Sequence, residues 1–187
     1  MLICEACSAR DRLLQMPEYI SCQRISIFVS MPKGELQTED IVRDALRSGK
    51  KVFVPYIYKT NSVDSDQPSS IMDMLQLRDE EDYRSLTPDK WGIPSIDAGS
   101  VNKRVNCSGG RGLTHGRLGA KADSGLDVVL VPAVAFDREM NRLGHGKGYY
   151  DNFLTRYFQD FPPRAQSQRT PHLSTPLCPR DLPVERF

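Results

Sequence analysis

The stretch Leu126-Asp127-Val128-Val129-Leu130-Val131-Pro132-Ala133-Val134-Ala135-Phe136 carries the strongest core signal of the chain. A continuous apolar run with polar residues at its ends is typical of a strand that is buried on both faces of a parallel sheet. Such a strand needs helices on both sides of the sheet. The run therefore predicts a layered α/β fold.

The residues before this run predict a strand–helix–strand unit. Alternation over 24–31 and the apolar residues of 52–58 indicate two strands. Between them, Thr38 is placed as a helix N-cap and Gly49 as the C-terminal cap. A helix that joins two strands over so short a distance makes the strands parallel. With a further helix predicted at 149–158, we expect one α/β domain over residues 1–158, with three αβα layers and a mainly parallel sheet.

Two stretches fall outside this pattern. The segment from 98 to 122 has no acidic residue, and its basic residues lie among glycines. It either contacts phosphates or is a solvated loop, and we interpret 98–124 as a loop insertion. Residues 159–187 hold six of the thirteen prolines and no apolar periodicity, so we expect an irregular Pro-rich tail.

Composition narrows the class of protein. The chain has 187 residues and a net charge of +1, which gives no bias toward nucleic acid or an anionic membrane. No apolar run approaches the roughly 20 residues of a membrane helix. The five cysteines are scattered, and Cys4-x-x-Cys7 has no second pair to complete a zinc site. We therefore expect a cytoplasmic protein that binds neither nucleic acid nor membrane. We also expect it to be a monomer.

The loop before the last predicted helix has the residues for binding an anion. It reads Asn141-Arg142-Leu143-Gly144-His145-Gly146-Lys147-Gly148-Tyr149-Tyr150-Asp151. Its glycines let backbone N–H groups approach an anion, and the positive end of the following helix points to the same place. Arg142 adds a forked donor, Lys147 adds a point charge, and Asp151 is placed to hold a magnesium ion.

This loop fits neither of two common phosphate motifs. A P-loop requires Ser or Thr after its Lys, where Gly148 stands, and the dinucleotide fingerprint requires Gly where Tyr149 stands. From the residues alone, two interpretations stay open. One is an anion-binding loop, and the other is a Gly-rich turn with solvated basic side chains.

Taken with other segments, the loop resembles the signature of the 5-formyltetrahydrofolate cyclo-ligase family, also called methenyltetrahydrofolate synthetases. Val131-Pro132, Ala135-Phe136-Asp137 and the loop 141–151 carry this resemblance. Residues 24–38, 49–58 and Trp91-Gly92-Ile93-Pro94 are also similar, so the resemblance covers roughly residues 17–156.

The resemblance implies an enzyme with ATP as co-substrate and Mg²⁺ as cofactor. ATP would phosphorylate the formyl oxygen of 5-formyltetrahydrofolate, N10 would attack the activated carbon, and phosphate would leave to give 5,10-methenyltetrahydrofolate. Such catalysis depends mainly on positioning and on neutralising charge at the transferred phosphoryl group. The catalytic residues that the resemblance implies are Arg142 and Lys147.

The resemblance also implies binding residues. The ATP site would comprise Arg142, Leu143, Gly144, His145, Gly146, Lys147, Gly148, Tyr149 and Tyr150. The folate site would comprise Val29, Glu35, Trp91, His145, Gly146, Lys147, Gly148 and Tyr149. Asp151 would ligate magnesium. Trp91 has an equal alternative as a core residue under a loop, whereas Met72 and Met74 are expected in the core.

Some positions depart from the family pattern. Met140 stands where the family has Gly, and His145 stands where it has Arg. The family's N-terminal Lys-x-x-x-Arg helix and its C-terminal strand with a second magnesium-binding Asp find no match here. A truncated, weakly active or inactive relative that binds ATP or folate without turnover is therefore the alternative. A nucleic-acid module using the basic residues 103–121 is disfavoured by the near-zero net charge.

Overall fold

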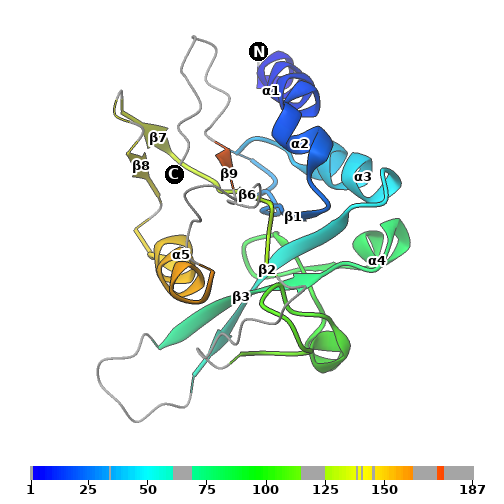
Figure 1. Cartoon of the computed structure of the whole chain (residues 1–187), viewed down its shortest axis with the longest axis vertical. Coiled ribbons are helices and arrows are strands. Elements are labelled where there is room, and N and C mark those ends of the chain that lie inside the picture. Colours follow the sequence, from blue (N-terminus) through cyan, green and yellow to red (C-terminus); the bar gives the residue numbers. More distant parts are fainter. Residues whose placement is uncertain are drawn as a thin grey trace.

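A five-stranded sheet with strand order β3-β2-β1-β6-β9 forms the centre of the computed structural model (Figure 1). β1, β2, β6 and β9 run parallel, and β3 is antiparallel to β2. The strands of this sheet are β1 Arg24–Ser26, β2 Lys51–Lys59, β3 Ser70–Gln76, β6 Val128–Leu130 and β9 His172–Ser174. The structure describes residues 2–33, 35–60, 69–114, 125–137, 139, 141–144, 146–161 and 172–174.

Helices cover both faces of this sheet. They are α1 Leu2–Gln15, α2 Pro17–Ser21, α3 Glu39–Arg47, α4 Glu80–Arg84 and α5 Tyr149–Asp160. One apolar cluster takes Ile41, Val42 and Ala45 from α3, and a second cluster takes Phe153 and Tyr157 from α5. The two clusters pack on opposite faces, so the expected three-layer α/β fold is confirmed. Within the described residues, every helix falls short of the length and apolarity that crossing a bilayer requires.

The β1–α3–β2 unit follows the sequence pattern. β1 and β2 are parallel, with Ile25 opposite Val52. Gly49 follows α3 with φ +74°, which suits a glycine that ends a helix. Thr38 precedes α3 as expected, but its hydroxyl donates to the Phe28 carbonyl, 2.7 Å away, and makes no cap within the helix. The fully buried Thr38 thus ties the start of α3 to the chain leaving β1.

The apolar run 126–136 departs from the expected single strand. Its first part is β6, and its last part is β7 Ala135–Phe136, which pairs with β8 Arg142–Leu143 in a separate two-stranded sheet. Pro132 lies between the two strands and has no N–H to donate to a ladder. The chain therefore leaves the central sheet after β6 and forms a hairpin at its end. Similarly, the strand expected over 24–31 pairs as β1 only over Arg24–Ser26.

The described part of the basic stretch is not a solvated loop. After the 3₁₀ helix η1 Ala98–Lys103, Val105 accepts a hydrogen bond from the Gln76 N–H, and the Cys107 N–H donates to Met74. Cys107 is fully buried. Residues 104–107 thus cover the edge of β3, while 115–124 lie outside the described residues. That 98–124 is an insertion stays a prediction.

Three further points concern the expected core and tail. Met72 and Met74 are buried, as expected. A second small sheet pairs β4 Thr87–Pro88 with β5 Pro94–Ser95. Within the tail that was expected to be irregular, β9 pairs with β6, and the rest of 162–187 lies outside the described residues.

Candidate functional site

Two loops meet at the carboxyl end of the parallel sheet. One follows β1 and contains Glu35, and the other follows β6 and contains the glycine-rich segment. Because β1 and β6 are parallel neighbours, both loops leave the sheet at the same edge. Ligands of open α/β sheets bind at this edge.

The β7–β8 hairpin holds the start of the glycine-rich loop. Its turn is closed by Asp137, whose carboxylate accepts hydrogen bonds from the backbone N–H groups of Glu139 and Asn141, at 2.9 and 2.8 Å, and from the Asn141 amide. The Asn141 side chain, its backbone N–H and that of Glu139 hold the pKa of Asp137 below its ordinary value. Asp137 belongs to the quoted signature, and its carboxylate is the group that closes this turn. Met140, the departure from the family pattern, lies outside the described residues.

Two glycines adopt left-handed conformations where the loop enters α5. Gly148 is the N-cap of α5 with φ +66°, and Gly146 has φ +79°. A side chain at Gly146 would meet no atom within 4 Å, so its surroundings are open. The loop backbone is therefore accessible beside the positive end of a twelve-residue helix, which favours an anion. His145 lies outside the described residues.

Charged side chains surround this backbone. Arg142 is mostly buried, donates to the Pro132 carbonyl at 3.1 Å and pairs with the Asp151 carboxylate, which is 69% exposed. Lys147 is exposed, and no described carboxylate forms an ion pair with it. Leu143 is also exposed, at 62%. The segment therefore presents one cation already fixed by the protein and one that faces solvent.

Tyr150 connects the two loops. It packs against both apolar clusters, and the Arg142 guanidinium lies 6.0 Å from its ring centre. Burial, and then the negative charge of Glu35, raise the pKa of Tyr150, while Arg142 opposes the shift. Glu35 and Arg142 thus act on the same phenol from the two loops. This proximity brings together residues far apart in the sequence, which only the folded chain shows.

The loop after β1 is fixed by its own side chains. The Glu35 carboxylate accepts a hydrogen bond from the Met31 N–H at 2.9 Å, and the Gln37 amide donates to the Met31 carbonyl at 3.0 Å. Val29 is 7% exposed and belongs to the first apolar cluster. Glu35 therefore has a defined position beside Tyr150, whereas the Val29 side chain is part of the core.

Trp91 lies on the surface and not in the core, so the core alternative for this residue is wrong. Its side chain is 56% exposed, and the Lys90 ammonium lies 4.1 Å from the ring centre. The adjacent Gly92 has φ +79°, and a Cβ there would lie 3.0 Å from the Pro32 side chain. The Trp91 turn therefore rests against the loop that leads to Glu35.

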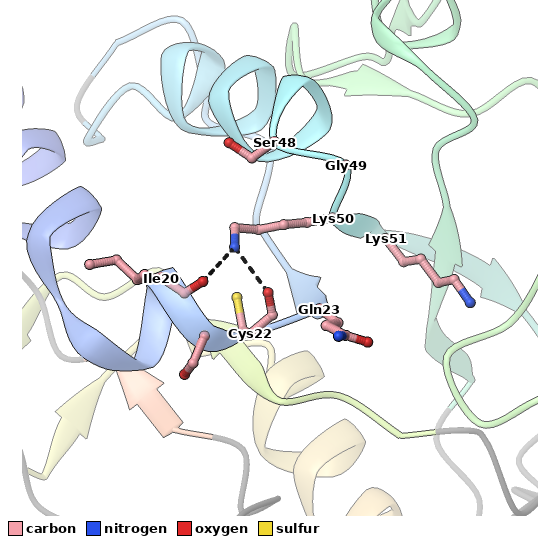
Figure 2. A pocket seen from close by; sticks show the side chains of 8 residues that line it. Ile20, Cys22, Gln23, Ser48, Gly49, Lys50 and Lys51 are labelled. Carbon is pink, nitrogen blue, oxygen red and sulfur yellow. Dashed lines mark hydrogen bonds between the residues drawn. The ribbon is translucent and has the colours of Figure 1, made fainter.

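A hollow of about 350 Å³ lies at the opposite, amino end of the parallel strands. Figure 2 shows the Lys50 ammonium pointing into the chain that precedes β1, where it donates to the carbonyls of Ile20 and Cys22 at 3.3 and 2.9 Å. The lining residues are Ile20, Ser21, Cys22, Gln23, Ser48, Gly49, Lys50 and Lys51. None of the predicted site residues lines this hollow.

Among the described residues, Asp151 is not part of a cluster of side chains that could hold a metal ion. Within the residues that the structure describes, no group of three or more His, Cys, Asp or Glu side chains is placed to hold a metal ion. Mg²⁺ is commonly held by one or two carboxylates together with substrate phosphates and water. One exposed carboxylate beside a glycine-rich loop is therefore a donor set that suits Mg²⁺ bound with a nucleotide.

Comparison with known proteins gives consistent relatives. The sequence profile of the 5-formyltetrahydrofolate cyclo-ligase family matches residues 3–186. A probable 5-formyltetrahydrofolate cyclo-ligase of Schizosaccharomyces pombe is 30% identical over 156 residues, which cover 82% of this chain and 62% of that protein. The 5-formyltetrahydrofolate cyclo-ligase of Mus musculus is 33% identical over 165 residues, covering 82% of this chain and 69% of that one.

A solved structure supports the fold. The NMR structure of Aquifex aeolicus 5,10-methenyltetrahydrofolate synthetase matches with a TM-score of 0.50 at 23% identity, over 81% of this chain and 61% of that chain. The present chain thus spans about three fifths of the length of several proteins that it matches.

Proposed function

The chain belongs to the 5-formyltetrahydrofolate cyclo-ligase family, and from this premise we propose that it converts 5-formyltetrahydrofolate and ATP to 5,10-methenyltetrahydrofolate, ADP and phosphate. The γ-phosphoryl group moves to the formyl oxygen, and ADP leaves. N10 then attacks the activated carbon, loses its proton, and the carbon–oxygen bond breaks to release phosphate.

The observation that carries this proposal is the glycine-rich loop at the N-terminus of α5. Gly146 and Gly148 expose the backbone N–H groups, Lys147 faces solvent, and Arg142 is held beside them. A transferring phosphoryl group spreads charge over its oxygens, and fixed donors neutralise that charge without reorganisation. We assign Arg142 and Lys147 to this role, with residues 143–150 lining the phosphates.

Asp151 is the residue that we assign to magnesium. When bound with ATP, Mg²⁺ would neutralise charge on the phosphate oxygens. Asp151 now pairs with Arg142, so binding of the nucleotide would give both side chains new partners. Arg142 would turn its forked donors to phosphate, and Asp151 would turn to the cation.

We assign the folate to the side of the loop that faces Glu35. The Glu35 carboxylate would accept hydrogen bonds from pterin N–H groups. Tyr150 stays protonated near neutral pH because burial and Glu35 raise the pKa of its phenol, so it remains a donor between the two subsites. Trp91, exposed on the neighbouring turn, offers a face on which a flat ring would stack.

The remaining assignments concern the setting. We place the protein in the cytoplasm as a monomer with two small-molecule substrates and no nucleic-acid or membrane partner. Size-exclusion chromatography with light scattering would check the monomer, and a dimer mass would contradict it.

The test is the appearance of methenyltetrahydrofolate absorbance on mixing the purified protein with 5-formyltetrahydrofolate, magnesium and ATP. We expect product that requires ATP and that is lost in Lys147→Ala. A folded protein that binds ATP or folate and forms no product would instead support a binding protein without turnover.

A further inference from the structure

A carboxylate that the proposed reaction does not use is buried in the middle of β3. Asp73 is 0% exposed. Its oxygens accept hydrogen bonds from the Thr114 N–H at 2.7 Å and from the Thr114 hydroxyl at 2.8 Å, and the Tyr58 hydroxyl donates at 3.3 Å. A buried charge persists in a protein when it is paired and hydrogen-bonded. Asp73 therefore anchors the 104–114 segment and β2 to β3.

The cation that faces Asp73 comes from α5. Arg156 Nη2 lies 3.7 Å from Asp73 Oδ1 and donates to the Met72 carbonyl at 2.7 Å. α5 packs Phe153 and Tyr157 with Met72 and Met74. Side chains alternate across a strand, so Asp73 lies on the other face of β3 from Met72 and Met74. The Arg156 side chain thus reaches around β3 beside Met72.

We propose that this Asp73–Arg156 contact is a positioning device for the glycine-rich loop, a role that rests on the proposed function of that loop. Among the described elements, β3 provides the main packing surface of α5. Apolar contacts resist separation of α5 from the sheet but are non-directional. A hydrogen bond and an ion pair are directional, so they fix how far α5 slides along β3 and how it turns.

The link from this contact to the loop is short and rigid. Arg156 follows Asp151 by five residues of one helix, about 7.5 Å along its axis. Gly148 and Lys147 lie immediately before the same helix. In the hairpin that precedes them, the Asn141 N–H donates to the Asp137 carboxylate and Arg142 donates to the Pro132 carbonyl. Arg142 also pairs with Asp151 of α5 itself. The placement of the loop relative to the Glu35 side of the site therefore depends on where α5 sits.

The test compares Arg156→Gln with Arg156→Lys, which keeps the positive charge. Two dissociation constants are measured, one for a non-hydrolysable ATP analogue with magnesium and one for 5-formyltetrahydrofolate alone. Since misplacing a binding group by about 1 Å costs up to a hundredfold, we expect Arg156→Gln to bind the ATP analogue about 10- to 100-fold more weakly. Folate affinity falls less, because Glu35 and Trp91 of the proposed folate site lie outside the loop, and Arg156→Lys recovers most of the affinity for the analogue.

Amide hydrogen exchange of the ligand-free protein gives a readout that does not depend on any substrate. We expect Arg156→Gln to accelerate exchange in peptides covering 141–150 and to leave β2 unchanged. Phe158→Ala is the matched control, because Phe158 is partly buried in the cluster of α5 and lies on the same helix without a polar contact to β3. It should lower the thermal midpoint and leave exchange over 141–150 near wild type.

Two results would overturn the proposal. One is unchanged exchange over 141–150 in Arg156→Gln, and the other is equal weakening of the ATP analogue by Arg156→Gln and Phe158→Ala at an equal loss of thermal midpoint. Failure of the proposed function has a different signature, in which the wild-type protein binds neither ligand. In that case the exchange data alone decide whether Arg156 positions the loop.

Discussion

Two lysines of this chain lie beside left-handed glycines at opposite ends of the parallel sheet. At the amino end, Lys50 follows Gly49, and its ammonium donates to two backbone carbonyls. At the carboxyl end, Lys147 precedes Gly148, is exposed, and has no described carboxylate partner. A lysine beside a left-handed glycine thus binds backbone carbonyls at one end of the sheet and faces solvent at the other.

The difference lies in what the surrounding backbone offers a cation. Lys50 finds carbonyls at the end of α2, and the carbonyl end of a helix stabilises positive charge. Lys147 lies beside the N–H end of α5, where a helix favours negative charge. A cation at this position is unfavourable until an anion joins it. The site is therefore marked by unsatisfied charge, whereas the hollow of about 350 Å³ at the amino end is lined by a lysine that already has its partners.

The largest expected effect is on enzyme activity, which should fall on replacing Lys147 but not on replacing Lys50. We expect Lys147→Ala to lower kcat/KM for ring closure by about 10²- to 10³-fold, the usual loss on removing one donor to a developing charge. Lys50→Ala should keep nearly wild-type activity per folded molecule. Initial rates of methenyltetrahydrofolate formation at several ATP concentrations measure both. Equal losses in the two variants would show that Lys147 does not contact phosphate.

The two glycines make a matched pair for the next effect. Gly49 and Gly146 have φ of +74° and +79°, and a Cβ at either would meet no atom within 4 Å. Alanine at either position should therefore destabilise the fold similarly, by about 1–2 kcal/mol of left-handed strain. Only Gly146→Ala should weaken the apparent affinity for ATP, by about 10-fold or more, because its methyl group obstructs the approach of phosphate to the backbone.

Urea unfolding and the KM for ATP would be measured on both glycine variants. An increase in KM for Gly49→Ala as large as that for Gly146→Ala would remove the distinction between the two ends of the sheet.

For the free energy of unfolding we expect the opposite order, with a larger loss on replacing Lys50 than on replacing Lys147. Lys50→Ala leaves the carbonyls of Ile20 and Cys22 without a donor and removes the ammonium 4.9 Å from the Tyr19 ring centre. We expect a loss of about 1–2 kcal/mol in the free energy of unfolding. Lys147→Ala removes a cation from the wrong end of α5 and should leave stability unchanged or raise it by a few tenths of a kcal/mol. Chemical denaturation without nucleotide measures both, and a larger loss for Lys147→Ala would contradict the comparison.

Local sequence signals predicted the elements that carry the site. The apolar spacing of 149–158 predicted α5. Gly49 predicted the end of α3, because the left-handed conformation that ends a helix depends on the local backbone. The glycine-rich loop is equally local, since its residues are contiguous. The family resemblance suggested the reaction that we propose and the role that we assign to Glu35.

Long-range contacts could not be predicted in this way. The proximity of Glu35, Tyr150 and Arg142 depends on β1 and β6 becoming neighbours. The pairing of Asp73 with Arg156 joins residues from two elements that share no sequence pattern. The single strand expected over 126–136 was wrong because apolar character does not show where a chain leaves a sheet, although Pro132 was a usable signal.

The smallest expected effect is a difference in pH dependence between the two ends of the parallel sheet. Asn141 and the N–H of Glu139 hold the pKa of Asp137 below its ordinary value, which is about 4. A lowered pKa in the folded state means that the carboxylate form is favoured there. The hairpin is therefore fully stabilised above about pH 4 and loosens as the pH falls below that value. At the amino end, burial raises the pKa of the Cys22 thiol. The neutral thiol therefore stabilises the fold fully below its ordinary pKa of about 8.5, and this stabilisation is lost as the pH rises above that value.

NMR would follow the amide signals of Glu139, Asn141 and Cys22 between pH 6 and pH 3, a range of about 3 units around the Asp titration. We expect the first two signals to shift and broaden before global unfolding, while Cys22 stays in place. Asp137→Asn is the matched control, because its side chain still accepts one hydrogen bond and does not titrate. If the Asn141 amide responded to acid equally in this variant, the carboxylate would not be what closes the turn. The placement of Arg142 would then have to come from its contacts with Pro132 and Asp151.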